Sequence, residues 1–202
     1  MRRAASVRFL VQWVLANAVG WAVGFRGMSF VLTTFDPPAF HGFLRVAAYL
    51  VGVVVVAVLQ LVVLRKYINR QALWILLTLG GLALSIVALL AIGGTLESAL
   101  MEHDEDLVGI ALALSITFYG LGAIIGAVQW LHLRQQYLEA GWWIPANGVG
   151  WATGALVVLA VGLIGDGGSE WLAYAMGGAM TGTISGYFLL QLLRRPLTPT
   201  TA

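Results

Sequence analysis

The segment WIPANGVGWATG, residues 143–154, has a close copy near the start of the chain, WVLANAVGWAVG at residues 13–24. The two segments carry the same amino acid at eight of twelve positions, including the Asn at the fifth and the Trp at the ninth. A third, weaker copy, WILLTLGGLALS at residues 74–85, keeps the first Trp and has Thr in place of Asn. This repetition predicts a fold built from several copies of one structural unit.

A second apolar segment repeats as well. GAIIGAVQWLHLR at 122–134 shares its Gln and its final Leu-Arg with VVVVAVLQLVVLR at 53–65, and it shares two glycines and the final Leu-Arg with GTISGYFLLQLLR at 182–194. The unit is therefore a hairpin of two apolar helices with a short turn. Two hairpins are intact, and the last and first helices complete a third. Because repeats of one orientation are related by an axis along the membrane normal, we predict a pseudo-threefold ring with the helix at 171–193 beside the helix at 9–32.

These segments resemble those of uncharacterised bacterial multipass membrane proteins that carry repeated GxxxGxxQWLxLR and WxxANxxGW segments. Residues 122–134 and 143–151 carry the pattern in full, and residues 13–21 carry its second half. The resemblance implies a membrane protein of the same repeat type in the bacterial cytoplasmic (inner) membrane. It implies no activity.

The composition is that of a membrane protein. Of 202 residues, 60% are hydrophobic and 10% are charged, whereas soluble domains have about half and a quarter. Six charge-free intervals reach or approach the roughly 20 residues that a helix needs to cross the hydrocarbon layer. We predict an all-α integral membrane protein with a single domain, residues 1–202. Its transmembrane helices are expected at 9–32, 44–64, 72–95, 107–133, 142–164 and 171–193.

The charges are divided between the two sides of the predicted bundle. Nine of the 11 Lys and Arg residues lie at the chain ends or in alternate loops, and most acidic residues lie in the other loops. Short loops rich in Lys and Arg stay cytoplasmic, so both termini are predicted to be cytoplasmic. The partners expected are the lipid bilayer and other membrane protein subunits, with no nucleic acid. The sequence does not define a small-molecule ligand.

Two groups of residues are candidates for the contacts between helices. Amides and a hydroxyl recur at similar depth, where they would either bond each hairpin to its neighbour or line a chamber for a solute. Glycines spaced by four, as in GxxxG, form stripes on which helices approach closely. The polar candidates are Asn17, Gln60, Thr78, Gln129 and Asn147. The packing candidates are Gly20, Gly24, Gly122, Gly126, Gly150, Gly154, Gly178, Gly182 and Gly186.

With both termini cytoplasmic, the first, third and fifth helices run outwards across the membrane. Tryptophans mark the starts of these outward helices. Indole prefers the membrane interface, so four of them are predicted to form an aromatic belt there. Trp21 and Trp151 lie eight residues deeper in their helices. They would either fill space near the axis or stack on a bound apolar molecule. The predicted belt residues are Trp13, Trp74, Trp142 and Trp143.

On the predicted outer side of the bundle, away from the Lys- and Arg-rich loops, the sequence has only two cations, Arg26 and Arg45. Charges close to the membrane are functional hypotheses by default. These two would either pair with the acidic loops or, together with His41, bind a small anion at the outer mouth of the bundle.

Catalysis and metal binding find no support in the sequence. The chain has no cysteine, and the acidic stretch ESALMEHDED at 97–106 lacks the spacing of a calcium loop. Ser185, in GTISG, lacks the preceding glycine and the histidine that a rhomboid-type protease needs. His132 has no partner histidine for haem or chlorophyll and is predicted to be interfacial. We expect no catalytic residue, no metal and no cofactor.

Two functions remain open. The first is a non-enzymatic structural or interaction subunit that packs with other membrane components. The second is a small-solute or lipid-binding module, because six helices in 202 residues and the small-residue stripe Ala16/Gly20/Gly24 are similar to the substrate-capturing component of energy-coupling-factor transporters. The threefold repeat is a departure from that family.

Overall fold

A computed structural model describes residues 3–26, 41–102, 107–165 and 170–197 of the chain. Within these residues the regular structure is helical, apart from an isolated β-bridge between Tyr137 and Pro196. The predicted all-α class is therefore confirmed. The elements are α1 (Arg3–Trp21), the π-helix η1 (Ala22–Arg26), α3 (His41–Leu64), α4 (Gln71–Glu102), α5 (Leu107–Leu133), the short 3-10 helix η3 (Ala140–Trp142), α6 (Trp143–Ile164) and α7 (Glu170–Leu193).

The helices differ from the predicted bounds mainly at their polar ends. α1 begins at Arg3, and residues 27–32 of the predicted first span lie outside the described residues. α4 continues to Glu102, beyond the predicted end at residue 95. Arg and Glu are good helix formers, so a charged residue ends an apolar interval without ending the helix.

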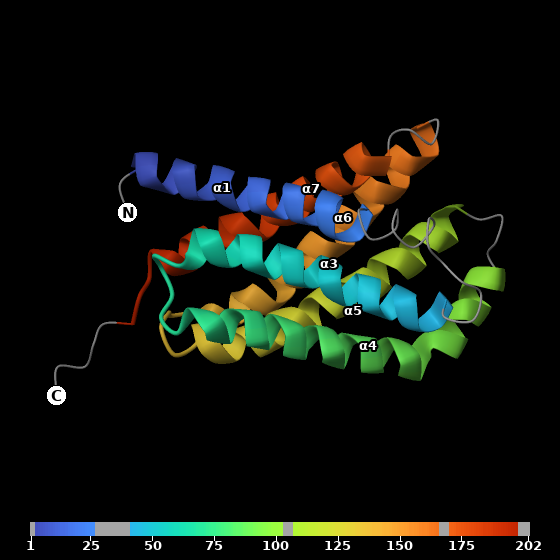
Figure 1. Ribbon diagram of the computed structural model, residues 1–202, viewed down its shortest axis with the longest axis horizontal. Coiled ribbons are helices and arrows are strands. Elements are labelled where there is room, and N and C mark those ends of the chain that lie inside the picture. The colour runs from blue at the N-terminus through green and yellow to red at the C-terminus, as the bar shows by residue number, and fades with distance from the viewer. Residues whose placement is uncertain (1–2, 27–40, 103–106, 166–169, 198–202) are drawn as a thin grey trace.

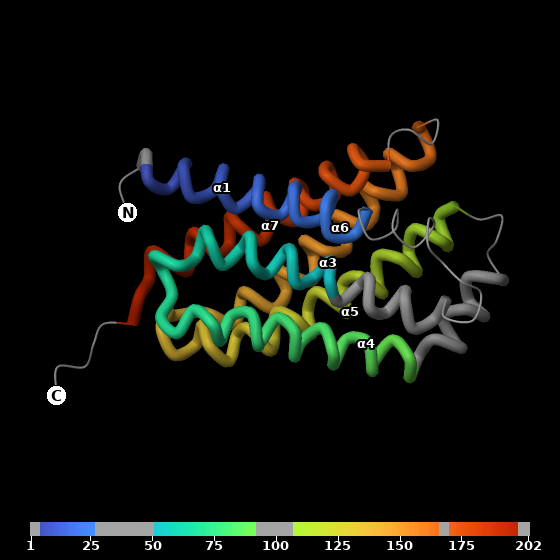
Figure 2. The backbone as a smooth tube through the Cα atoms, viewed as in Figure 1, coloured from blue at the N-terminus to red at the C-terminus, as the bar shows by residue number. Residues whose placement is uncertain are grey.

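Each α-helix contacts the next one along the chain, and α7 also contacts α1, so the contacts form a closed ring. Figure 1 shows α1 and α7 running side by side. The start of α1, the end of α7 and the α3–α4 and α5–α6 turns all lie at one end of the bundle (Figure 2). We call this the basic end; it comprises residues 3–8, 64–71, 133–140 and 193–197.

The apolar helices are those of a membrane-embedded protein. Four stretches of the described residues are long and apolar enough to cross a membrane: Ala5–Arg26, Gln71–Ala91, Leu107–Leu133 and Ala140–Ile164. In α3 the corresponding described stretch, Val51–Leu64, is shorter. Apolar side chains face outwards along α1 and η1 with a spacing of four residues, at Val7, Val11, Leu15, Val19 and Val23.

All nine glycines of the predicted series lie at helix contacts. A Cβ atom built on Gly24 would lie 2.6 Å from the carbonyl oxygen of Gly52, and one on Gly122 would lie 2.7 Å from that of Asn147. Lipid gives helices no hydrophobic reason to associate, so close backbone packing takes that role. The glycines therefore set the distances between neighbouring helices.

Candidate functional site

Three tryptophans meet inside the bundle towards the basic end. Trp13, Trp74 and Trp143 are 0%, 0% and 1% exposed. The ring centroid of Trp143 lies 6.3 Å from that of Trp13 and 6.0 Å from that of Trp74. The prediction that these three form an interfacial belt is wrong, because filling the interior of the ring outweighs the interfacial preference of indole. Trp142, by contrast, is 60% exposed.

Gln129 lies at the centre of a hydrogen-bonded polar layer beside these tryptophans. Its Oε1 accepts hydrogen bonds from Trp143 Nε1 at 2.9 Å and from Asn147 Nδ2 at 3.3 Å. Its Nε2 donates to Thr78 Oγ1 at 2.8 Å. Gln129 thus joins α5 to α6 and to α4, and it brings three of the predicted polar candidates together in a buried site.

The other two polar candidates form a second bond in this layer. Gln60 Nε2 donates to Asn17 Oδ1 at 3.0 Å, which joins α3 to α1. Trp13 Nε1 donates to Ser185 Oγ at 3.1 Å and so joins α1 to α7. Trp74 Nε1 is buried and has no hydrogen-bond partner among the described residues. We call these tryptophans, Gln129, Gln60, Asn17, Thr78, Asn147 and Ser185 the polar layer.

The sequence did not reveal Ser185 as a member of this layer, because the alignment of α7 was one helical turn out of register. That alignment paired Gly126 with Gly186. A Cβ on Gly126 would lie 3.0 Å from Cβ and 3.3 Å from Nδ2 of Asn147, and a Cβ on Gly182 would lie at the same two distances from Asn17. Gly182, and not Gly186, therefore corresponds to Gly126. Close packing of the glycines fixes this register, whereas the exposed Arg194 at the end of α7 can lie one turn farther along.

An aromatic cavity of about 250 Å³ lies farther from the basic end. Trp21 and Trp151 form part of its wall, with ring centroids 5.5 Å apart in an edge-to-face arrangement. Trp21 is 3% exposed, and its Nε1 has no hydrogen-bond partner among the described residues. The remaining lining residues are Phe25, Leu114, Phe118, Ala155, Val158, Leu159 and Tyr174.

Arg26 lies near this cavity and is neutralised by a neighbour. Its Nε lies 2.5 Å from a carboxylate oxygen of Glu170, and its guanidinium lies 5.9 Å from the ring centroid of Trp171. The side chains of His41 and Arg45, the other residues of the predicted outer anion site, lie outside the described part of the structure. The charge of Arg26 is thus compensated within the chain.

His132, which was predicted to be interfacial, lies beside the basic end and is buried within the protein, with 3% exposure. Its Nε2 lies 2.8 Å from the carbonyl oxygen of Asn69 and 3.0 Å from Nε2 of Gln136. The loop after α3 folds over it and shields it from solvent. Among the described residues, no group of three or more metal-ligating side chains is present.

The loops at the basic end also bond to one another. The Tyr137 hydroxyl donates to the carbonyl oxygen of Tyr67, and burial raises the pKa of this hydroxyl. The backbone nitrogen of Leu138 donates to the carbonyl oxygen of Arg195 at 3.0 Å. The short loops therefore form a connected layer with the residues directly after α7.

Comparison with protein families, curated proteins and solved structures finds no match to this chain.

Proposed function

We propose that the chain is a non-enzymatic structural or interaction subunit of the bacterial cytoplasmic membrane. In this proposal six helices cross the membrane as three hairpins around a pseudo-threefold axis, and both termini are cytoplasmic. The four long apolar helices and the closed ring of contacts support this arrangement.

Matching contacts between hairpins support the threefold relation. A Cβ on Gly20 would lie 3.1 Å from Cα of Val56, and one on Gly81 would lie 2.8 Å from Cα of Ile125. The third pair, at the junction of α6 and α7, is Gly150 with Thr181, where the corresponding distance is 3.6 Å. In each case a small residue on the outward helix lies against the backbone of the inward helix that follows it.

The observation that carries the proposed function is that the amides and hydroxyls of the polar layer bond partners on neighbouring helices, whereas the indole nitrogen of Trp74 has no partner among the described residues. Gln129 uses both ends of its amide on neighbouring helices, and the amide nitrogen of Gln60 bonds Asn17. Amides and hydroxyls bonded in this way hold helices together and provide no nucleophile or acid–base pair. With the polar interior engaged in packing, the outer faces of the helices remain for contact with partner subunits.

The proposed topology predicts which loops are accessible from each side. Reporter fusions at residue 68 and at residue 202 should both report the cytoplasm, because the Lys- and Arg-rich loops stay inside. The stretch at 102–106, EHDED, should be cleaved only by protease added outside. A fusion at residue 68 that reports the outer side would contradict the topology.

The aromatic cavity favours a second candidate function, the binding of a small apolar molecule. Its wall is mainly aromatic and aliphatic, with Trp21, Phe25, Phe118, Trp151 and Tyr174 supplying the rings. Apolar walls with a few polar groups are typical of ligand sites, although 250 Å³ is slightly below the usual range of about 300–1,000 Å³. The candidate ligand is therefore small.

Native mass spectrometry of the protein in gently extracted membranes distinguishes these functions. The structural proposal predicts co-purifying protein subunits that stay bound when Leu114→Trp fills the cavity. The second candidate predicts a bound small molecule that is lost in Leu114→Trp and kept in Leu112→Trp, a matched change at an exposed position of the same helix. Wild-type spectra that contain neither a partner subunit nor a small molecule would contradict both.

A further inference from the structure

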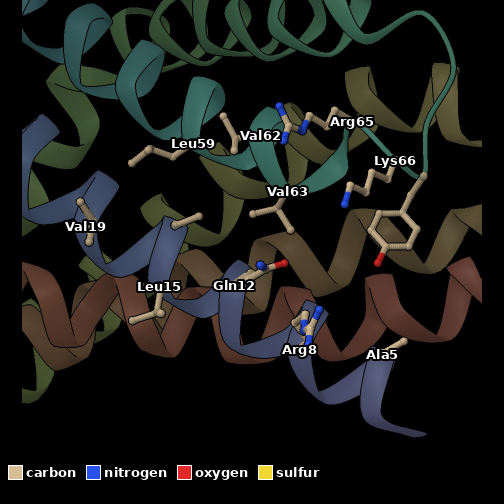
Figure 3. Close-up of a pocket in the computed structure, with 12 residues that line it drawn as sticks. Ala5, Arg8, Gln12, Leu15, Val19, Leu59, Val62, Val63, Arg65 and Lys66 are labelled. Atoms are coloured by element: carbon tan, nitrogen blue, oxygen red, sulfur yellow. The ribbon is translucent and has the colours of Figure 1, made fainter. Parts of the chain in front are cut away.

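A cleft of about 950 Å³ lies between α1 and α3, beside the basic end. Figure 3 shows that Arg8, Arg65 and Lys66 gather at one end of it, and that Leu15, Val19 and Leu59 lie at the other. The cleft thus changes along its length from cationic to apolar. Its other lining residues are Ala5, Gln12, Ala16, Val62, Val63 and Tyr67.

The cleft exists because the backbones of α1 and α3 approach closely farther from the basic end, whereas near that end Phe9 contacts the ring of Tyr67 from one side. Farther from that end, a Cβ on Gly20 of α1 would lie 3.1 Å from Cα of Val56, and one on Gly24 of η1 would lie 2.6 Å from the carbonyl oxygen of Gly52. The bond between Gln60 and Asn17 is another link between the two helices. Among the described residues, no hydrogen bond joins α1 to α3 between this link and the basic end.

The corresponding place between α4 and α5 is filled. By the repeat, Asn69 and His132 hold the places of Arg8 and Val63. Nε2 of His132 lies 2.8 Å from the carbonyl oxygen of Asn69, which closes that junction at the basic end. The junction of α6 and α7 is also closed, by the bond from Leu138 to the chain after α7. The open cleft is thus a feature of the α1–α3 junction.

The dimensions of the cleft match one leaflet of a bilayer. Arg8 and Val19 are 11 residues apart on α1, which corresponds to about 16 Å along a helix. One leaflet contributes about 15 Å of the hydrocarbon core. An occupant with its charged group at Arg8 would therefore have its apolar part beside Val19, near the middle of the membrane.

The cations of the cleft are available to a ligand. Arg8, Arg65 and Lys66 are exposed, and within the described residues none of them forms an ion pair. No acidic residue lines the cleft. Gln12, between the charged and apolar parts, adds an amide that can donate hydrogen bonds. The site therefore suits an occupant with an anionic head.

We propose that this cleft binds one anionic phospholipid of the leaflet at the basic end, which is the cytoplasmic leaflet in the proposed topology. The phosphate lies among Arg8, Arg65 and Lys66, and an acyl chain lies along Leu15, Val19 and Leu59. The lipid fills the place that His132 and Asn69 close between α4 and α5. This binding site is additional to the proposed structural function and does not depend on a partner subunit.

The test measures lipid retention by the whole purified protein in detergent. Native mass spectra recorded with equal amounts of phosphatidylglycerol and phosphatidylcholine should show one retained phosphatidylglycerol. The variant Arg8→Gln/Arg65→Gln/Lys66→Gln should bind it roughly 100-fold more weakly, because each of the three cations near anionic lipid contributes on the order of 1 kcal/mol. The control Arg70→Gln/Arg134→Gln/Arg194→Gln loses the same charge at the basic end outside the cleft and should bind like the wild type.

Two further measurements distinguish lipid binding in the cleft from non-specific attraction of anions to the basic end. Gln12→Trp keeps every charge and fills the cleft, so it should also lose the lipid. Glycerol phosphate, which has the anionic group without acyl chains, should not displace the lipid. The proposal is overturned if phosphatidylcholine is retained equally, if the control loses as much binding, if Gln12→Trp retains the lipid, or if glycerol phosphate displaces it. Unchanged thermal unfolding of all variants without lipid establishes that each is folded.

Discussion

Gly122→Ala is expected to lower the free energy of unfolding by about 1–3 kcal/mol, the usual cost of overpacking a well-packed site. The added methyl group would lie 2.7 Å from the carbonyl oxygen of Asn147 and 2.8 Å from Cβ of Trp151. Neither atom is the end of a flexible side chain, so α5 and α6 must move apart. Thermal or denaturant unfolding in detergent measures the effect.

Gly120→Ala is the matched control, two residues earlier in the same helix. A Cβ on Gly120 meets no atom within 4 Å. Alanine is also the better helix former, by up to about 1 kcal/mol, so this variant should unfold like the wild type or at slightly higher temperature. Equal stability of the two variants would show that the α5–α6 contact is looser than described.

Gln129→Leu is expected to lower the free energy of unfolding by about 2–4 kcal/mol. The change removes three hydrogen bonds between helices, each contributing about 0.6–1.7 kcal/mol in a membrane protein. It also leaves the buried Nε1 of Trp143 without its acceptor. The fluorescence of the buried tryptophans gives a second measurement, since Trp143 would lose its hydrogen bond to this amide.

Gln60→Leu is the graded control for this effect. Gln60 is partly buried and forms one hydrogen bond between helices, to Asn17. Its replacement should cost roughly 1 kcal/mol. If Gln129→Leu and Gln60→Leu lower the free energy of unfolding by the same amount, the three bonds of Gln129 contribute no more than one ordinary interhelical bond. The central place of Gln129 in the polar layer would then be refuted.

Hydropathy was sufficient to predict the helices, and the repeat was sufficient to predict the neighbours of α1. A helix interior in a membrane must be apolar over many consecutive residues, so the charge-free intervals marked each helix within a few turns. The Asn at positions 17 and 147 each marked a place where two glycines of a neighbouring helix pack closely. The contact between α1 and α7 agrees with the expectation that the two unpaired halves lie together.

Features that depend on side-chain competition could not be predicted in the same way. Trp13 fits an interfacial belt by position alone, and only the enclosed space around it shows why the indole points inwards. Ser185 was missed because an exposed arginine was a poor marker of register. The cleft between α1 and α3 is open because, among the described residues, no side chain or loop closes this junction as His132 closes the one between α4 and α5. A short sequence motif does not indicate such an absence.

Closure of the ring by α7 has a consequence for the order of assembly during synthesis. α1 is made before α3, α4, α5, α6 and α7, yet Gly178 and Gly182 of α7 pack against Asn17 of α1. Until α7 is inserted, that face of α1 and the indole nitrogen of Trp13 lack their final partners. The hairpins α3–α4 and α5–α6 can each form as soon as their second helix enters the bilayer. The third unit must wait until α7 has been made, so the nascent protein presents an open edge on α1 while the helices between them are synthesised.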